Sequence, residues 1–255
     1  MISGLYKSAS AMTIEEVKHD VLANNVANAA TVGFKKDNVV ISPFDEILSS
    51  ASRKIGGSET LYQSPIGGIV SESLTDFSQG PIKRTDNELD VAITGDGFFA
   101  VETPEGIRYT RSGNFALSSD NQLVMAGSPG HAVLASGNTP VTIPGTGGKI
   151  TIDKRGGITV GNESAGRLQV TDFEKPYRLR KVGDNLFAPV GEGTGEDAAE
   201  GSYTIENKAL EMSNVNIIEE MVSMIINQRI YQTSQKMIQA QDQTLQSAIN
   251  DVGRV

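Results

Sequence analysis

The chain has 255 residues, and 22 lysines and arginines stand against 31 aspartates and glutamates, which gives a formal charge of −9. That length is enough for a buried core in one or two domains. The acidic balance and the lack of long basic runs disfavour binding to nucleic acid or an anionic membrane. The absence of cysteine excludes disulfides, thiolate nucleophiles and cysteine metal sites. No apolar run is long enough to predict a membrane-spanning helix or a cleaved signal peptide.

An amino-terminal helix is the first predicted element. Steps of three and four residues select a mainly apolar stripe: Ile2, Leu5, Ala9, Met12, Glu16, His19, Ala23 and Val26. Asn24, Asn25 and Asn28 then follow, and asparagine favours helix ends, where its side chain bonds nearby backbone. We expect Gly33 and Phe34 to turn the chain there and anchor it.

Residues 37–79 are mixed in composition and interrupted by several glycines. We expect an irregular connector with a short helix at Pro43 to Ala51.

Short strands separated by turn signals are predicted from Leu89 to Glu206. They are Leu89–Thr94, Phe98–Thr103, Ile107–Thr110, Gln122–Met125, Ala132–Ala135, Lys149–Asp153, Arg167–Thr171 and Tyr203–Glu206. Strands at this spacing predict an antiparallel all-β domain, which we place at residues 80–208.

A long helix is predicted from Asn216 to Val252, because this stretch contains neither glycine nor proline. Asn216 is the expected N-cap, and Gly253 the expected stop. The predicted seam is Ile217, Met221, Met224, Gln228, Tyr231, Gln235, Ile238, Asp242, Leu245, Ile249 and Val252, of which eight are apolar. It spans about 54 Å at ~1.5 Å per residue.

The predicted fold is α+β, with the amino- and carboxy-terminal helices paired in a coiled-coil-like bundle and an antiparallel all-β domain inserted between them. The helical domain comprises residues 1–36 and 209–255. One interpretation is two ordinary helices packed on a core. We favour the other, in which the pair also presents apolar surface to further subunits, because small and polar residues interrupt both stripes.

The motifs that could carry chemistry have simpler explanations. Gly95-Asp-Gly97-Phe98-Phe-Ala100 matches a dinucleotide-binding pattern, but strand rather than helix follows, so Gly95, Gly97 and Phe98 indicate a tight β-turn. The alternating acids near Asp90 lack the spacing of a calcium loop. His19 and His131 form no metal motif. We therefore predict no catalytic residue, no cofactor and no metal site.

Several segments in different parts of the chain resemble segments of one known family. Residues 23–35 read ANNVANAATVGFK, which resembles its amino-terminal signature. QGP at 79–81, LDVAITGDGFF at 89–99 and YTRSGNF at 109–115 resemble its central domain. LEMSNV at 210–215, followed by the long helix, resembles its carboxy-terminal end. The matches occur in the family's order along the chain, and the family that they resemble is that of the bacterial flagellar rod and hook proteins.

The resemblance implies an axial structural subunit of the flagellar basal-body rod, which self-assembles into a helical tube and transmits torque from motor to hook. It implies export through the flagellar type III apparatus without signal cleavage, and no insertion into a membrane. The implied partners are copies of the chain, other rod proteins, the hook protein, the bushing of the basal-body rings and the export apparatus.

Length and domain content leave the larger proximal-rod subunit and the distal-rod subunit open. The tail from Lys236 to Arg254 favours the proximal type, whereas residues 210–216 fit the distal type at least as well. Of the two, we favour the proximal rod. Two other functions compete with a structural role. A glycan- or peptidoglycan-binding β domain is disfavoured because tryptophan is absent and aromatic residues are few. An enzyme is disfavoured because no nucleophile, base and orienting group converge.

Overall fold

The computed structural model describes residues 2–43, 68–144, 148–161, 163–191, 195–199 and 201–252. The chain divides into two compact units. The helix unit comprises Met1–Ala27, Asp37–Asp76 and Asn216–Val255, and the β unit comprises Asn28–Lys36 and Phe77–Val215. The predicted boundaries differ from this division in several segments: residues 28–36, 77–79 and 209–215 belong to the β unit, and residues 37–76 belong to the helix unit.

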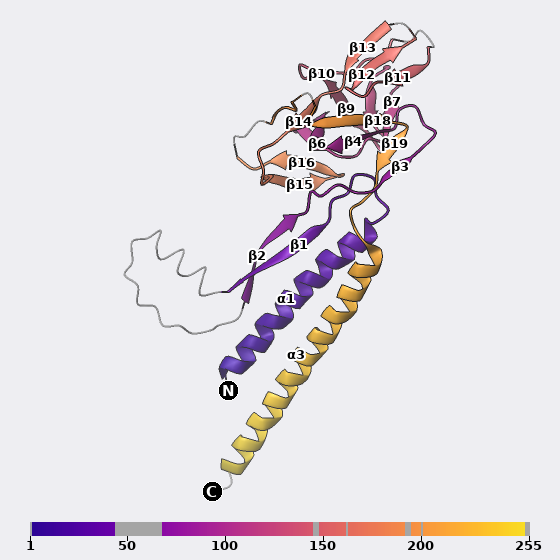
Figure 1. Ribbon diagram of the computed structural model, residues 1–255. Helices are drawn as coiled ribbons and strands as arrows, with labels where there is room; N and C mark the ends of the chain where they lie inside the picture. Colours follow the sequence, from indigo (N-terminus) through magenta and orange to yellow (C-terminus); the bar gives the residue numbers. More distant parts are fainter. Residues whose placement is uncertain are drawn as a thin grey trace, which may run out of the picture. The chain divides into compact units, whose positions relative to one another are not determined.

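Two antiparallel helices make up most of the helix unit (Figure 1). They are α1 (Ile2–Ala27) and α3 (Ile217–Val252), and they lie side by side. Asn216 is the N-cap of α3, as predicted, since its Oδ1 accepts a hydrogen bond from the Ile218 N–H at 3.1 Å. Gly253, the predicted stop, lies outside the described residues.

A two-stranded antiparallel ribbon completes the helix unit and packs against α1. Its strands are β1 (Asp37–Pro43) and β2 (Gly68–Thr75), with a bulge between Val40 and Ile41. Residues 37–79 were expected to be irregular and instead contain this ribbon. The helix expected after Pro43 lies outside the described residues.

The β unit is built from short, mostly sequential antiparallel strands. Its main sheet has the order β15-β16-β6-β5-β9-β8-β7, with β10 beside β9, β14 beside β5, and β17 beside β14. The strands of that sheet are β5 (Phe98–Thr103), β6 (Gly106–Thr110), β7 (Phe115–Leu117), β8 (Leu123–Met125), β9 (Ser128–Ala135), β10 (Thr139–Pro140), β14 (Val170–Asp172), β15 (Leu179–Gly183), β16 (Leu186–Pro189) and β17 (Glu196–Asp197).

Three smaller sheets accompany it in the same unit. They are β11 (Ile150–Ile152), β12 (Gly157–Val160) and β13 (Glu163–Arg167) in sequence order; β18 (Tyr203–Asn207) paired with β4 (Val91–Gly95); and β19 (Ala209–Glu211) paired with β3 (Ile82–Arg84). The last two pairs connect the end of the unit to its beginning.

Two apolar clusters form the core of the β unit. The larger contains Val91, Ile93, Phe99 and Phe115 among its buried residues. The smaller is aromatic and centres on Phe98, which is fully buried and touches the rings of Phe77, Phe173, Tyr177 and Phe187 edge-on. Alternate residues of β5 thus serve opposite clusters, as the two-residue period of a strand requires.

The Gly95-Asp-Gly97 segment is a turn between β4 and β5, as predicted. Gly95 and Gly97 have φ of +104° and +109°, where a side chain is strained. A β-carbon on Gly95 would lie 2.5 Å from the Ser202 carbonyl oxygen, and one on Gly97 2.6 Å from a Val170 methyl carbon. The glycine pattern therefore serves close packing.

Candidate functional site

Two polar residue pairs join α1 to α3. Asn227 Nδ2 donates to Glu15 Oε2 at 2.6 Å and to the Glu15 carbonyl oxygen at 3.0 Å. Asn25 Nδ2 donates to Glu220 Oε2 at 3.3 Å. All four side chains are buried. These two amide–carboxylate pairs are satisfied hydrogen bonds, so their burial avoids the cost of leaving polar groups without partners.

On α3, the described positions that are buried or partly buried fall in two rows that repeat every seven residues, and the exposed Tyr231 continues one of these rows. The polar row is Glu220, Asn227, Ser234 and Gln241; the apolar row is Met224, Tyr231, Ile238 and Leu245. Tyr231 is the most exposed member of the apolar row, at 37%. A search for apolar periodicity therefore finds the apolar row but not the polar row.

The predicted interface residues fall into three groups. Met12, Val26, Met224, Ile238 and Leu245 are partly covered. Ile217, Met221, Tyr231 and Ile249 are exposed. The side chains of Ile2 and Leu5 lie outside the described residues.

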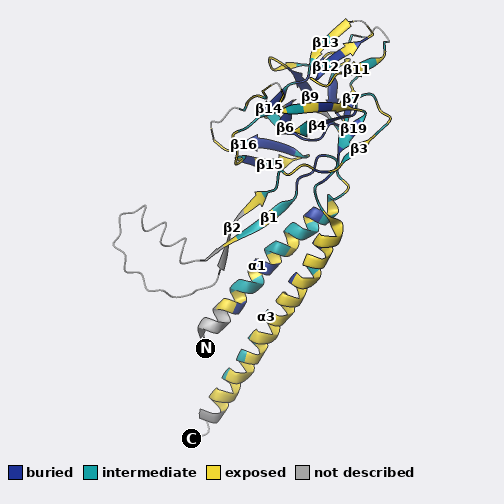
Figure 2. Ribbon diagram, viewed as in Figure 1, coloured by how far each residue is buried: buried dark blue, intermediate teal, exposed yellow. Residues whose placement is uncertain are grey.

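Opposite α1, the first turns of α3 carry an exposed apolar surface. We call it the apolar face, and it consists of Ile218, Met221, Val222, Ile225 and Ile226. Ile218 is 75% exposed, and each of the others is at least 50% exposed. At ~100° per residue, Ile218, Val222 and Ile225 point roughly 140–160° away from Glu220, which faces α1. Figure 2 shows exposure along most of α3.

Clustered exposed apolar side chains indicate an interaction surface, whereas single ones do not. Full burial of one Ile or Val side chain is worth about 1.5–3 kcal/mol. Covering the exposed half of these five residues therefore offers on the order of 5 kcal/mol per chain, before the cost of association. The apolar face therefore makes α3 suited to contact other chains.

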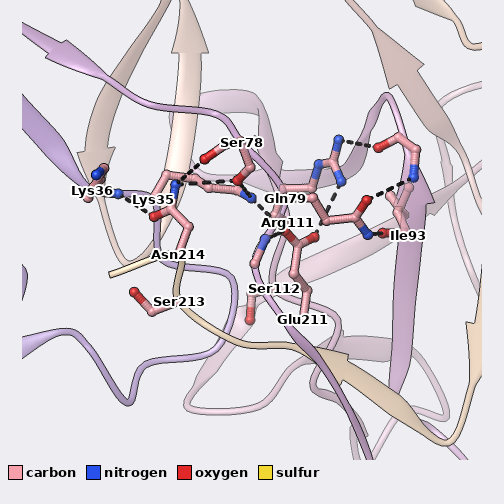
Figure 3. Close-up of polar contacts among 12 residues, drawn as sticks. Lys35, Lys36, Ser78, Gln79, Ile93, Arg111, Ser112, Glu211, Ser213 and Asn214 are labelled. Atoms are coloured by element: carbon pink, nitrogen blue, oxygen red, sulfur yellow. Dashed lines mark hydrogen bonds and ion pairs between the residues drawn. The ribbon is translucent and has the colours of Figure 1, made fainter. Parts of the chain in front are cut away.

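In the β unit, three buried charges join segments that are distant in sequence (Figure 3). We call Lys35, Arg111 and Glu211 the ion cluster. Lys35 Nζ donates to Glu211 Oε1 at 2.5 Å, and Arg111 Nη1 donates to Glu211 Oε2 at 3.3 Å. The side chains of Lys35 and Glu211 are fully buried, and that of Arg111 is 4% exposed.

Backbone groups balance the second positive charge of the ion cluster. Lys35 Nζ also donates to the Ser78 carbonyl oxygen at 2.7 Å, and Arg111 Nη2 donates to the Gly95 carbonyl oxygen at 2.8 Å. The Arg111 guanidinium lies 5.1 Å from the ring centroid of Phe98. The Gly80 N–H donates to Glu211 Oε1 at 2.9 Å.

The ion cluster closes the β unit where the chain enters and leaves it. The Gly33 N–H donates to the Glu211 carbonyl oxygen at 2.8 Å, and the Lys36 N–H donates to Asn214 Oδ1 at 2.8 Å. Gly33 has a φ of +69°, and a β-carbon there would lie 2.4 Å from the Ser112 nitrogen. Only glycine fits this contact without displacing backbone.

The predicted structural-motif residues at the end of α1 have distinct positions. Asn25 accepts a hydrogen bond from the Asp37 N–H at 3.0 Å and donates to the Asp37 carbonyl oxygen at 2.9 Å, besides its bond to Glu220. Asn28 accepts from the Thr31 hydroxyl at 3.3 Å. Asn24 is exposed. Phe34 is buried, with Lys181 Nζ 4.1 Å from its ring centroid.

Among the described residues, no group of three or more His, Asp or Glu side chains is placed to hold a metal ion. No described helix is both long and apolar enough to cross a membrane. The rings of Phe98, Phe99, Phe115 and Phe187 are buried in the core, so they offer no stacking surface to a sugar.

An α+β chain whose terminal helices pair while one apolar face stays exposed has the features of a structural subunit completed by neighbouring chains. Three family models match it: "Flagella basal body rod protein" at residues 5–35, "Flagellar hook protein FlgE/F/G D1 domain" at 92–160, and "Flagellar basal body rod FlgEFG protein C-terminal" at 206–251. The chain belongs to the flagellar basal-body rod protein family.

Similar proteins align over nearly the whole chain. The flagellar basal-body rod protein FlgG of Bacillus subtilis strain 168 is 34% identical, covering 98% of this chain and 99% of its own. The flagellar hook-basal body complex protein FlhO of the same strain is 30% identical over the full length of both. The flagellar basal-body rod protein FlgF of Caulobacter vibrioides is likewise 30% identical over the full length of both.

Apolar periodicity missed the functional polar residues. Lys35, Arg111 and Glu211 lie within the quoted family segments, but nothing in their spacing shows that they meet. Glu15, Glu220 and Asn227 were missed because none of them lies on either predicted apolar stripe. The one available signal was the seven-residue recurrence of polar side chains along α3.

Proposed function

We propose that this chain is a structural axial subunit of the flagellar basal-body rod. In this proposal α1 and α3 form a coiled-coil-like pair, and the apolar face of α3 packs against helices of further copies or of other rod proteins. Contacts that repeat head to tail without closing a ring generate an open helical assembly. Such a tube transmits torque from the motor to the hook, and no catalysis is involved.

The observation that carries the proposal is the apolar face of α3. Five neighbouring aliphatic side chains remain at least half exposed in a helix that already has a partner. Membership of the rod family supports the proposal that helices of rod subunits cover this face, since the relatives are named as rod proteins.

The remaining partners follow from the family resemblance. They are the hook protein, the bushing of the basal-body rings and the export apparatus, with export proceeding without signal cleavage. A proximal position in the rod stays a prediction from the carboxy-terminal tail, because relatives named FlgG and relatives named FlgF both align along the chain.

Ile225→Lys tests the proposal, with Ile225→Leu as the matched control. Ile225 is 52% exposed, so a lysine there leaves the isolated chain folded but puts a charge into the subunit contact. We expect basal bodies isolated from cells carrying Ile225→Lys to lack rod beyond this subunit, and those with Ile225→Leu to be complete. Export is scored separately by the amount of subunit leaving the cell. Complete rods built from exported Ile225→Lys chains would refute the proposed interface.

A further inference from the structure

The two buried amide–carboxylate pairs between α1 and α3 lie on the less apolar of two surfaces that α3 offers. A surface through Ile217, Met221 and Met224 would bury more aliphatic area against α1. The structure instead places Glu220 and Asn227 toward α1 and leaves Ile217 and Met221 about half exposed. Burial of apolar area alone would favour the other choice.

The two arrangements differ by a rotation of α3 about its own axis. At ~100° per residue, the direction of Ile217 and Met221 is about 60–100° from that of Glu220. A rotation of that size would bring part of the apolar face under α1 and turn Glu220 and Asn227 away from it.

Each polar pair opposes this rotation. Asn227 Nδ2 contacts two acceptors of Glu15, one in the side chain and one in the backbone, so rotation breaks both bonds. Glu15 is also held by Lys18, whose Nζ donates to Glu15 Oε1 at 2.9 Å. Asn25 is fixed by two bonds to the backbone of Asp37 while it donates to Glu220. Separating a buried polar pair destabilises the protein by more than the intact pair contributes to stability, because each group is left buried without its partner.

We propose that the pairs Glu15–Asn227 and Asn25–Glu220 act as a rotational key, which selects the polar surface of α3 for α1 and reserves the apolar face for another copy. Buried polar residues are known to fix which of several helix packings forms, at a cost in stability. The importance of the key for assembly rests on the proposed function, but the rotation itself is a property of the isolated chain.

Cysteine labelling of the isolated chain tests the rotation, because the protein contains no cysteine of its own. Met221→Cys reports on the surface now exposed, and Ser234→Cys on the surface now facing α1. In the otherwise unchanged chain, we expect a maleimide to label the cysteine at 221 several-fold faster than the one at 234.

The key is removed with Glu15→Ala, Glu220→Ala and Asn227→Ala together, which removes the polar pairs without adding large apolar side chains to the present contact and keeps the bonds between Asn25 and Asp37. We expect the labelling rate at 221 to fall and the rate at 234 to rise, so that their ratio reverses. The matched control is Glu16→Ala, Glu219→Ala and Gln228→Ala, which alters exposed residues on the same helices and leaves the ratio unchanged.

The reciprocal exchange Glu15→Asn with Asn227→Glu, in a chain that keeps Glu220, restores the side-chain amide–carboxylate pair but not the bond to the carbonyl oxygen of residue 15. We expect it to return the ratio part of the way toward its original value. An unchanged ratio in the triple alanine variant would overturn the proposal. So would a parallel rise at both positions, since that would show that the pairs supply stability alone. Loss of rod assembly is measured separately, and a failed assembly interface would leave the labelling result intact.

Discussion

Replacing Glu211 by glutamine removes the only negative charge of the ion cluster and leaves Lys35 and Arg111 buried together. Breaking a buried ion pair by removing one partner typically costs ~3–5 kcal/mol, because the remaining charge is uncompensated. Lys35→Met leaves Arg111 and Glu211 as a neutral pair, and Glu211 keeps its bond from the Gly80 N–H. That substitution should therefore cost less, about 1–3 kcal/mol.

Thermal unfolding of the full chain, followed by circular dichroism of the strands, measures both variants. A domain of this size loses ~2–4 °C in Tm per kcal/mol, so Glu211→Gln should lower Tm by on the order of 10 °C, and Lys35→Met by less. Lys83→Met, on the strand paired with that of Glu211, is the control and should stay within ~0.5 kcal/mol, since Lys83 is exposed. Equal decreases in Tm for Lys35→Met and Glu211→Gln would refute the argument that the uncompensated buried charge determines the loss of stability.

Three further outcomes are expected. Gly33→Ala should cost more than ~2 kcal/mol in urea unfolding, whereas Gly127→Ala, also at positive φ but with open space around it, should cost about 1 kcal/mol. Burial raises the pKa of Tyr109, so the stability that its neutral phenol contributes is full below pH ~10 and is lost as pH rises through the raised value. Tyr109→Phe should flatten that alkaline loss in pH-dependent unfolding. A chain cut to residues 28–215 should keep the cooperative thermal transition of the β unit, and one cut to 37–215 should lose it, because the packed segment with the buried Phe34 and Lys35 and the Gly33–Glu211 backbone bond is then missing; similar transitions would contradict the unit boundary.

The helices were predictable because each carries a local signal that does not depend on the partner. The stretch from Ile217 to Val252 lacks helix breakers, and Asn216 supplies the cap that the structure confirms. Several strands were also found within a residue or two, such as β5, which matches its predicted bounds. Alternation and turn residues are likewise local properties of the sequence.

Other elements were missed because their evidence lies elsewhere in the chain. The ribbon of β1 and β2 joins residues that are some thirty apart, and its partners are not apparent from either segment alone. The predicted strand Arg167–Thr171 instead covers the end of β13 and the start of β14, which pair with different neighbours. Strand boundaries depend on which edges pair, and pairing is a long-range property.

The exposed position of Ile217 and Met221 shows what apolar periodicity measures in an assembling protein. The period identifies side chains that are buried in some state of the protein, but it does not say whether the covering surface belongs to the same chain. On α3 the side that faces α1 and the side that stays exposed point in different directions around the helix. Glu220 and Asn227 lie on the first side, and the apolar face lies on the second. An apolar stripe that a folded chain leaves open, beside a polar row that it covers, is therefore evidence about neighbours rather than an error in the fold.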